Sequence, residues 1–245
     1  MFYKEKPFED LAQFKGITIE RAMEATKEDY NDPNKLRNLS LENYYKEANP
    51  LGYLNKENMI FHIVKDTNVL LFCFANNIKT TLELGCGASI TSLLLAKNGV
   101  NCIAYDFPSE VLRFQTWRKK KYRLTNLKYL GLTAFNKDRN QYDAVICFEV
   151  LEHIKDPRET IDKLDNKLKP GGLFFMTISS QAGINMDYLS KLDPEHICEM
   201  TNGEVVGYII DKGYDAVQGL RMSETRIYQH GNFPIVFKKR KQNEA

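Results

Sequence analysis

The stretch TLELGCGASITSLLLAKNG, residues 81–99, decides the fold. It begins as a short apolar strand, passes through Gly85-Cys86-Gly87, and continues into a leucine-rich run typical of a helix. Two glycines one residue apart between a strand and a helix usually let the backbone approach a ligand closely, because glycine has no side chain and tolerates positive φ. The sequence therefore predicts a ligand-binding turn at residues 85–87.

Beyond this turn, short apolar runs alternate with helical patterns, an order typical of a parallel α/β sheet. Helices are predicted at about 89–98, 108–122 and 157–168. The predicted strands are, in order, residues 80–84, 101–105, 127–130, 142–147, 173–178, 215–220 and 233–239. The last two form a hairpin-like pair, which predicts an antiparallel edge on an otherwise parallel sheet.

The N-terminal third of the chain has a different character, polar and helical in pattern. Helices are expected over residues 17–29 and 56–77, and the second has apolar positions spaced to pack on a sheet. We expect residues 1–79 to form a helical cap that serves as a substrate lid. Residues 80–240 would then be the ligand-binding core, and 241–245 a charged tail.

Composition excludes several classes of protein. The chain has 245 residues, of which 43% are hydrophobic, so it can bury one large core. Its net charge of +2 argues against a dedicated nucleic-acid binder. The basic runs WRKKKYR (117–123) and KKRK (238–241) are interpreted as solvated surfaces. The five cysteines form no CxxC pair and indicate free thiols in a reducing compartment. With no secretory signal and no apolar run of roughly 20 residues, a soluble cytoplasmic protein is expected.

The glycine turn differs from the dinucleotide-binding pattern in two details. That pattern requires a third glycine where this chain has Ile90, and here an acidic residue, Glu83, lies inside the strand. With these features the sequence resembles the class I S-adenosylmethionine (SAM)-dependent methyltransferases, whose first motif is an acidic residue followed by x-G-x-G. The resemblance extends over roughly residues 80–240.

Four further segments fit that family in order: AYDFPSEVL (104–112), YDAVICFEVLEHI (142–154), LKPGGLFFMT (168–177) and DPEHICEMTNGEVVGYIIDKGY (193–214). The resemblance implies a Rossmann-like, mostly parallel seven-stranded sheet with an antiparallel edge strand. Helices would cover both faces, and further helices would precede the core. It also implies SAM as the cofactor and S-adenosylhomocysteine as its product.

The same resemblance assigns the cofactor-binding residues. Asp106, at the end of the second strand, would bind both ribose hydroxyls, for which a carboxylate is suited as a double acceptor. The family usually has Gly-Asp after the third strand, but this chain has Gly131-Leu132-Thr133. Adenine would therefore be held by backbone groups and by apolar contact. The expected cofactor-binding residues are Glu83, Gly85, Cys86, Gly87, Asp106, Phe107, Leu132 and Phe148.

The segment FEVLEH (148–153) should begin a helix after the fourth strand, with Glu149, Glu152 and His153 on one face. Three interpretations stay open. The residues could orient the loop by hydrogen bonds, or, with His196, hold a divalent ion as in some ubiquinone-pathway O-methyltransferases and small-RNA 2′-O-methyltransferases. Alternatively, one of them acts as a metal-free general base. We favour the last, with His196, His153 and Glu149 as catalytic candidates and no metal.

These groups favour oxygen over nitrogen as the atom methylated. The predicted function is methyl transfer to a polar small molecule, for which a sugar or nucleotide-linked sugar is suggested. The alternatives are a metal-dependent RNA 2′-O-methyltransferase and a nucleotide-binding Rossmann protein, such as a nicotinamide oxidoreductase, that transfers no methyl group. No membrane contact is expected, nucleic acid is not the favoured partner, and the protein would be a monomer or homodimer.

Overall fold

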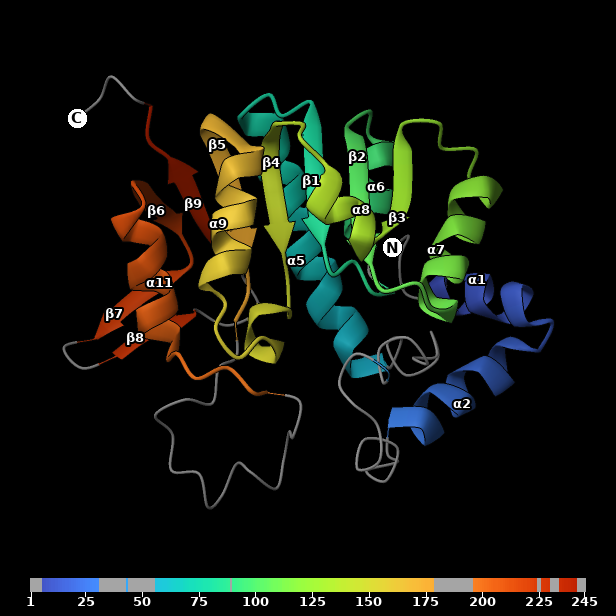
Figure 1. Cartoon of the computed structure of the whole chain (residues 1–245). Coiled ribbons are helices and arrows are strands. Elements are labelled where there is room, and N and C mark those ends of the chain that lie inside the picture. The colour runs from blue at the N-terminus through green and yellow to red at the C-terminus, as the bar shows by residue number, and fades with distance from the viewer. Residues whose placement is uncertain are drawn as a thin grey trace, which may run out of the picture.

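The central feature of the molecule is one seven-stranded sheet (Figure 1). The computed structural model describes residues 6–30, 43, 56–88, 90–178, 196–223, 226–229 and 234–241. The sheet has the strand order β3-β2-β1-β4-β5-β9-β6. Its strands are β1 (Thr80–Leu84), β2 (Asn101–Asp106), β3 (Leu127–Gly131), β4 (Tyr142–Cys147), β5 (Leu168–Met176), β6 (Tyr214–Gln218) and β9 (Ile235–Lys239). The first five are parallel, and β9 pairs antiparallel with both β5 and β6. The predicted fold class is confirmed.

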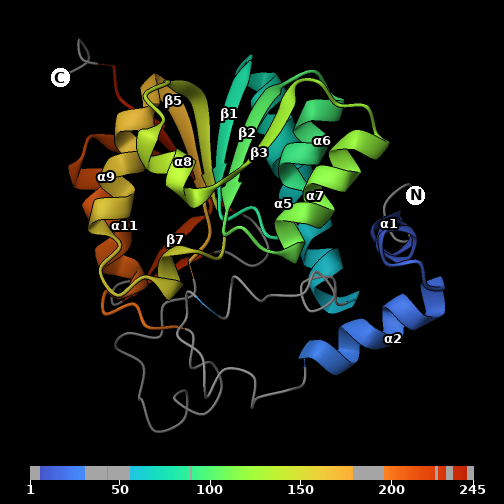
Figure 2. The ribbon, with the colours of Figure 1, turned by 45° about the vertical axis from the view of Figure 1, so that its right-hand side comes forward.

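Helices cover both faces of the sheet (Figure 2). One face carries α5 (Lys56–Ala75), α6 (Thr91–Lys97) and α7 (Glu110–Lys121), and the other carries α8 (Leu132–Lys137), α9 (Arg158–Lys167) and α11 (Asn202–Asp211). Two buried apolar clusters lie between these layers, one on each face. Strands buried on both faces read as continuous apolar runs, which is why the sequence located β1 and β4 to the residue.

The strand predicted at 215–220 is divided in two. Gly219 has φ +85°, and a Cβ atom there would overlap the carbonyl oxygen of Pro234. The chain turns at this glycine, so β6 ends and β7 (Leu220–Ser223) pairs with β8 (Arg226–Gln229) in a separate two-stranded sheet.

Three helices of the N-terminal segment are described. The predicted helices correspond to α2 (Ile19–Tyr30) and α5, whereas α1 (Lys6–Lys15) was not predicted. The expected packing of α5 on the sheet is confirmed, because Val69 and Cys73 are buried in the cluster that contains Phe175. Helix α1 lies beside α7, away from α5 (Figure 1).

All five cysteines are buried and unpaired, as the sequence predicts for free thiols. Burial raises the pKa of the Cys73 and Cys102 thiols to about 12. It also raises the pKa of Cys86 and Cys147 well above the usual range, and neighbouring carboxylates add to the shift. In the described part of the chain, no helix combines the length and apolar character needed to cross a membrane.

Asp143 fastens the amino end of β4 to its neighbours. Its Oδ2 accepts hydrogen bonds from the backbone N–H of Lys79 (3.0 Å) and from the N–H (2.8 Å) and hydroxyl (2.9 Å) of Thr80. Its Oδ1 pairs with Lys169 Nζ at 2.7 Å, at the start of β5. Partial burial disfavours the charged form, but these hydrogen bonds outweigh it and lower the pKa of Asp143.

We expect Asp143→Asn to lower the free energy of unfolding by about 1–3 kcal/mol at pH 7, because bonds to a charged acceptor are lost. A depressed pKa stabilises the fold above the unfolded value and ceases to do so as pH falls through the folded value. The difference between the two proteins should therefore shrink below about pH 4. Denaturant titration at pH 7 and pH 3 measures this. The exposed Asp211→Asn is the control, and a pH-independent difference would contradict the assignment.

Candidate functional site

The two glycines of the turn between β1 and α6 both adopt a left-handed backbone, which glycine tolerates without strain. Gly85 has φ +72° and Gly87 φ +46°, both in the left-handed region. A Cβ atom on Gly85 would overlap Cγ2 of Val150, in the loop after β4. The N–H groups of Gly85 and Cys86 donate to the carbonyl of Tyr105 at 2.8 and 3.3 Å. The turn is therefore held between the ends of β2 and β4.

Asp106 faces this turn from the end of β2. Its Oδ2 accepts the N–H of Gly87 at 2.5 Å and its Oδ1 accepts the N–H of Phe107 at 2.6 Å. Burial raises the pKa of Asp106, and the two backbone bonds oppose that shift. Each carboxylate oxygen has a second lone pair, so Asp106 can still accept two O–H groups from a ligand. This pair of acceptors fits the two hydroxyls of a ribose.

Glu83 is buried beneath the turn. Its Oε2 accepts the backbone N–H of Ser92 at 3.2 Å and the Ser92 hydroxyl at 2.5 Å. These two bonds tie the end of β1 to the first turn of α6. Cys86 is also buried and cannot act as a nucleophile at neutral pH, because its pKa is raised.

The apolar residues expected around the cofactor lie at the same edge of the sheet. Phe107 directly follows β2, Leu132 begins α8 after β3, and both are partly buried. Phe148 follows β4 and is buried. The carboxyl ends of parallel strands meet at one edge, which brings these three side chains to the side that carries the glycine turn.

Sequence reasoning missed two adjacent buried charges on α5. Lys65 and Asp66 are each 1% exposed. Lys65 Nζ lies 4.4 Å from the ring centroid of Phe148. Burial lowers the pKa of Lys65, and the charges of Asp66, Glu149, Glu83 and Glu152 oppose that shift. Adjacent charges inside the apolar run HIVKDTNVLLF were the available signal.

Asp66 reaches the first residue of α6. Its Oδ1 accepts the hydroxyl of Thr91, while its Oδ2 has no hydrogen-bond partner among the described residues. Burial raises its pKa to about 6, against the opposing effects of Lys65, Thr91 and Arg118. The pair therefore adds titratable charge directly behind the glycine turn.

The helix expected over FEVLEH does not form. Glu149 has φ +52°, and its N–H donates to the Thr177 hydroxyl at 2.9 Å. Only a short 3-10 turn, η1 (Leu151–His153), follows. The prediction that Glu149 shares one helix face with Glu152 and His153 was wrong, because a left-handed residue breaks helical periodicity. Glu149 is exposed, whereas Glu152 is fully buried.

His196 joins Glu152 and His153 from a distant part of the chain. The Cys198 N–H donates to the Glu152 carbonyl at 3.1 Å, which fastens the segment before α11 to η1. The rings of His153 and His196 meet edge to face, with centroids 5.0 Å apart. One ligand atom from each of Glu152, His153 and His196 lies within 4.8 Å of the others. Three of the four residues predicted for this site thus meet, without Glu149.

Comparison with known proteins agrees with this geometry. The model of the methyltransferase domain family matches residues 58–218. A ubiquinone biosynthesis O-methyltransferase from Hydrogenovibrio crunogenus is 32% identical over 158 residues, covering 60% of this chain and 61% of the relative. One from Coxiella burnetii is 29% identical over 149 residues, covering 60% and 59%. The chain thus spans about three fifths of the length of these curated relatives.

Solved structures share the fold at low sequence identity. Magnesium protoporphyrin IX methyltransferase from Synechocystis PCC 6803 has a TM-score of 0.56 at 14% identity, covering 90% of this chain and 95% of that one. A SAM-dependent methyltransferase from Clostridium acetobutylicum has a TM-score of 0.54 at 14% identity, covering 72% and 90%. Because the family match extends over more than half of the chain, this protein belongs to the SAM-dependent class I methyltransferase family.

Proposed function

We propose that this protein transfers a methyl group from SAM to an oxygen atom of a polar small molecule. The observation that carries the proposal is the group Glu152, His153 and His196, gathered after β4. Val150 of the same loop lies against Gly85, so this group neighbours the glycine turn. An oxygen acceptor must lose its proton as it attacks, and imidazole ordinarily changes charge between pH 5 and 8.

The names of the curated relatives support an oxygen acceptor, since they are O-methyltransferases of ubiquinone biosynthesis. The proposal covers more than one class of hydroxylated acceptor. A sugar or nucleotide-linked sugar and a hydroxylated aromatic compound are the two classes to compare, using transfer of labelled methyl from SAM. Methylation of an amine but of neither hydroxyl class would contradict the proposal.

The cofactor would be held by groups that converge on the glycine turn. Asp106 would accept the ribose hydroxyls, while the backbone of Gly85-Cys86-Gly87 approaches the ligand. Leu132 and Phe107 would enclose adenine, with Phe148 beside them and Glu83 fixing the loop from below. When bound, SAM supplies a methyl group on a sulfonium, which the acceptor attacks in line. The chain's contribution is orientation and exclusion of water.

The acid–base work is assigned to the two histidines. Either His196 or His153 would take the proton of the acceptor hydroxyl, and Glu152 would orient the imidazole beside it. Glu149 was also a candidate, and its exposure and distance from this group leave it the weaker one. A metal-free site remains the favoured form.

A second form of the site has specific support. A carboxylate and two imidazoles within 4.8 Å of one another suit a divalent ion such as Zn²⁺ or Mn²⁺. A bound ion would acidify the acceptor hydroxyl in place of a base. This is also the form that a metal-dependent RNA 2′-O-methyltransferase would need. The two forms differ in how activity responds to chelators.

The segment before the core is proposed to cover the acceptor. Of residues 1–79, α5 is packed on the sheet, so the covering part would be the residues that precede it. Residues 80–240 would form the catalytic core and 241–245 a tail.

The five free thiols support the further proposal of a reducing, cytoplasmic location. Fractionation of the source cells tests the location, and recovery with an oxidising compartment would refute it.

Asp106→Ala should raise the dissociation constant of SAM by roughly one to two decades, because a charged acceptor for two hydroxyls is lost. Isothermal calorimetry measures this directly. The exposed Asp211→Ala serves as the control for loss of one negative charge. Unchanged SAM affinity in folded Asp106→Ala would show that the ribose lies elsewhere.

Lys65→Met tests whether the buried ammonium faces the carboxylate of SAM. Its charge lies beside Phe148, one of the proposed cofactor-binding residues, so its loss should weaken SAM binding by about tenfold. The nucleoside analogue 5′-methylthioadenosine lacks that carboxylate, and its affinity should change little. An equal loss for both ligands would instead indicate that Lys65 only supports the fold.

One set of turnover assays distinguishes the metal-free form of the Glu152–His153–His196 site from the metal-dependent form. In the metal-free form, EDTA leaves turnover intact and His196→Gln or His153→Gln lowers it by about 10²–10⁴-fold. Glu199→Gln, an exposed neighbour, is the matched control. Inhibition by EDTA that Mn²⁺ or Zn²⁺ reverses would establish the metal-dependent form.

A further inference from the structure

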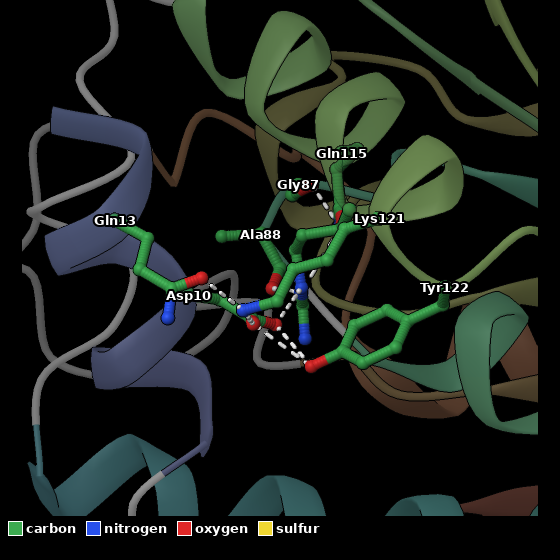
Figure 3. A network of polar contacts seen from close by, with 8 residues as sticks. Asp10, Gln13, Gly87, Ala88, Gln115, Lys121 and Tyr122 are labelled. Carbon is green, nitrogen blue, oxygen red and sulfur yellow. Dashed lines mark hydrogen bonds and ion pairs between the residues drawn. The ribbon is translucent and has the colours of Figure 1, made fainter.

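Helix α1 is fastened to α7 through a buried carboxylate (Figure 3). Asp10 is 1% exposed, and Arg118, 2% exposed, donates from Nε to its Oδ2 at 3.1 Å. Lys121 Nζ donates to Oδ1 at 2.6 Å, and the Tyr122 hydroxyl lies 2.8 Å from the same oxygen. The interpretation of the run 117–123 as a solvated surface is therefore wrong for Arg118, the most buried of its basic residues.

The same network continues to the glycine turn. Arg118 Nη1 donates to the carbonyl of Ala88 at 3.4 Å and to Gln115 Oε1 at 3.2 Å. Gln115 Nε2 donates to the carbonyl of Gly87 at 2.9 Å. Figure 3 shows Gln115 and Gly87 above the carboxylate of Asp10, with Tyr122 below them and to the right. The turn thus presents its carbonyls to α7 and the N–H of Gly87 to Asp106.

Apolar packing covers the Asp10–Arg118 pair at the centre of this network, whereas Lys121 at its edge is exposed. Phe14 of α1 meets Phe114 and Trp117 of α7, with ring centroids 5.3 and 5.8 Å apart. Ala88 belongs to the same buried cluster as Leu11 of α1. A charge pair sealed in this way is strongly disturbed by removal of one partner, because the other charge stays buried and uncompensated.

We propose that α1 is a positioning element for the cofactor, and that Asp10 sets SAM affinity without touching SAM. Asp10 fixes the Arg118 side chain, and Arg118 and Gln115 fix the carbonyls of Gly87 and Ala88. The peptide planes of the turn then hold the orientation that keeps the Gly87 N–H on Asp106. This inference rests on the proposed SAM site, and it adds a role for the N-terminal segment that is separate from covering the acceptor.

Coupling between α1 and the turn must act in both directions. If docking of α1 favours SAM binding, SAM must favour docking of α1 by the same factor. A purely structural ion pair would stabilise the protein but would not give the amides of α1 greater protection when SAM is added. This reciprocity supplies a measurement that does not depend on catalysis.

The principal variant is Asp10→Asn in the full chain, and the matched control is Glu110→Gln. Glu110 also joins the two helices, through Lys15 Nζ at 2.7 Å, but within the described residues neither member of that pair hydrogen-bonds to the turn. Both substitutions change a carboxylate to an amide. By calorimetry, we expect Asp10→Asn to raise the SAM dissociation constant about tenfold and Glu110→Gln less than about twofold. Hydrogen exchange of α1 should slow with SAM in the wild type and Glu110→Gln, but not in Asp10→Asn.

Gln115→Met covers the case in which Asp10→Asn does not fold. It keeps the Asp10–Arg118 pair and removes the bond to the Gly87 carbonyl, so SAM affinity should again fall by about tenfold. Wild-type SAM affinity in folded Asp10→Asn or in Gln115→Met, or an equal loss in Glu110→Gln, would overturn the inference and leave the proposed function standing. A wild-type protein that binds no SAM would overturn both.

Discussion

The turn after β1 depends on hydrogen bonds that its own glycines cannot supply. Gly85 and Gly87 allow a left-handed backbone, but that freedom by itself favours many conformations over one. The structure restricts it from several directions, through the carbonyl of Tyr105, the carboxylate of Asp106 and the amide of Gln115. Because the partners come from two different elements, β2 and α7, the sheet and α7 must be assembled before the turn has a defined shape.

The strand order places that turn where a ligand can reach it. The order reverses between β1, which continues to β2 and β3, and β4, which continues to β5. Connections leave these two strands toward opposite faces, and the carboxyl ends at such a reversal are where open α/β sheets bind ligands. Val150 from the loop after β4 closes against Gly85 across this point. The cofactor residues and the histidine group therefore share one edge although they lie far apart in sequence.

Several charged side chains are fully buried in this protein. Removing a charge from water costs free energy, so we ask what these residues contribute to the site. Lys65, Asp66, Asp10 and Arg118 are all at most 2% exposed. Desolvation makes such pairs weak sources of stability, and apolar replacements are often as stable. Asp66 contacts Thr91, the first residue of the helix after the glycine turn, and Arg118 contacts the carbonyl of Ala88 beside that turn. Their placement favours a role in fixing the geometry of the site.

The sequence was most informative where the signal is local. Strands β1 and β4 and the five aligned motifs could be read directly, since apolar runs and turn residues act over a few positions. The prediction of a helix failed at Glu149, which has a left-handed backbone. Its N–H donates to the hydroxyl of Thr177, a residue 28 positions away. Sequence reasoning also missed the contact of Asp10 with Arg118, 108 residues apart. The spacing of residues within one segment does not show which distant residue a side chain will contact.

The burial of every cysteine has a practical consequence. Thiol-directed reagents react with an accessible thiolate, and here none of the five sulfur atoms offers one in the folded protein. A cysteine introduced at an exposed position, such as Glu20 on α2, would be the sole target for a maleimide dye. The native chain is thus already suited to site-specific fluorescence labelling, and motion of its N-terminal helices could be followed without first removing any natural residue.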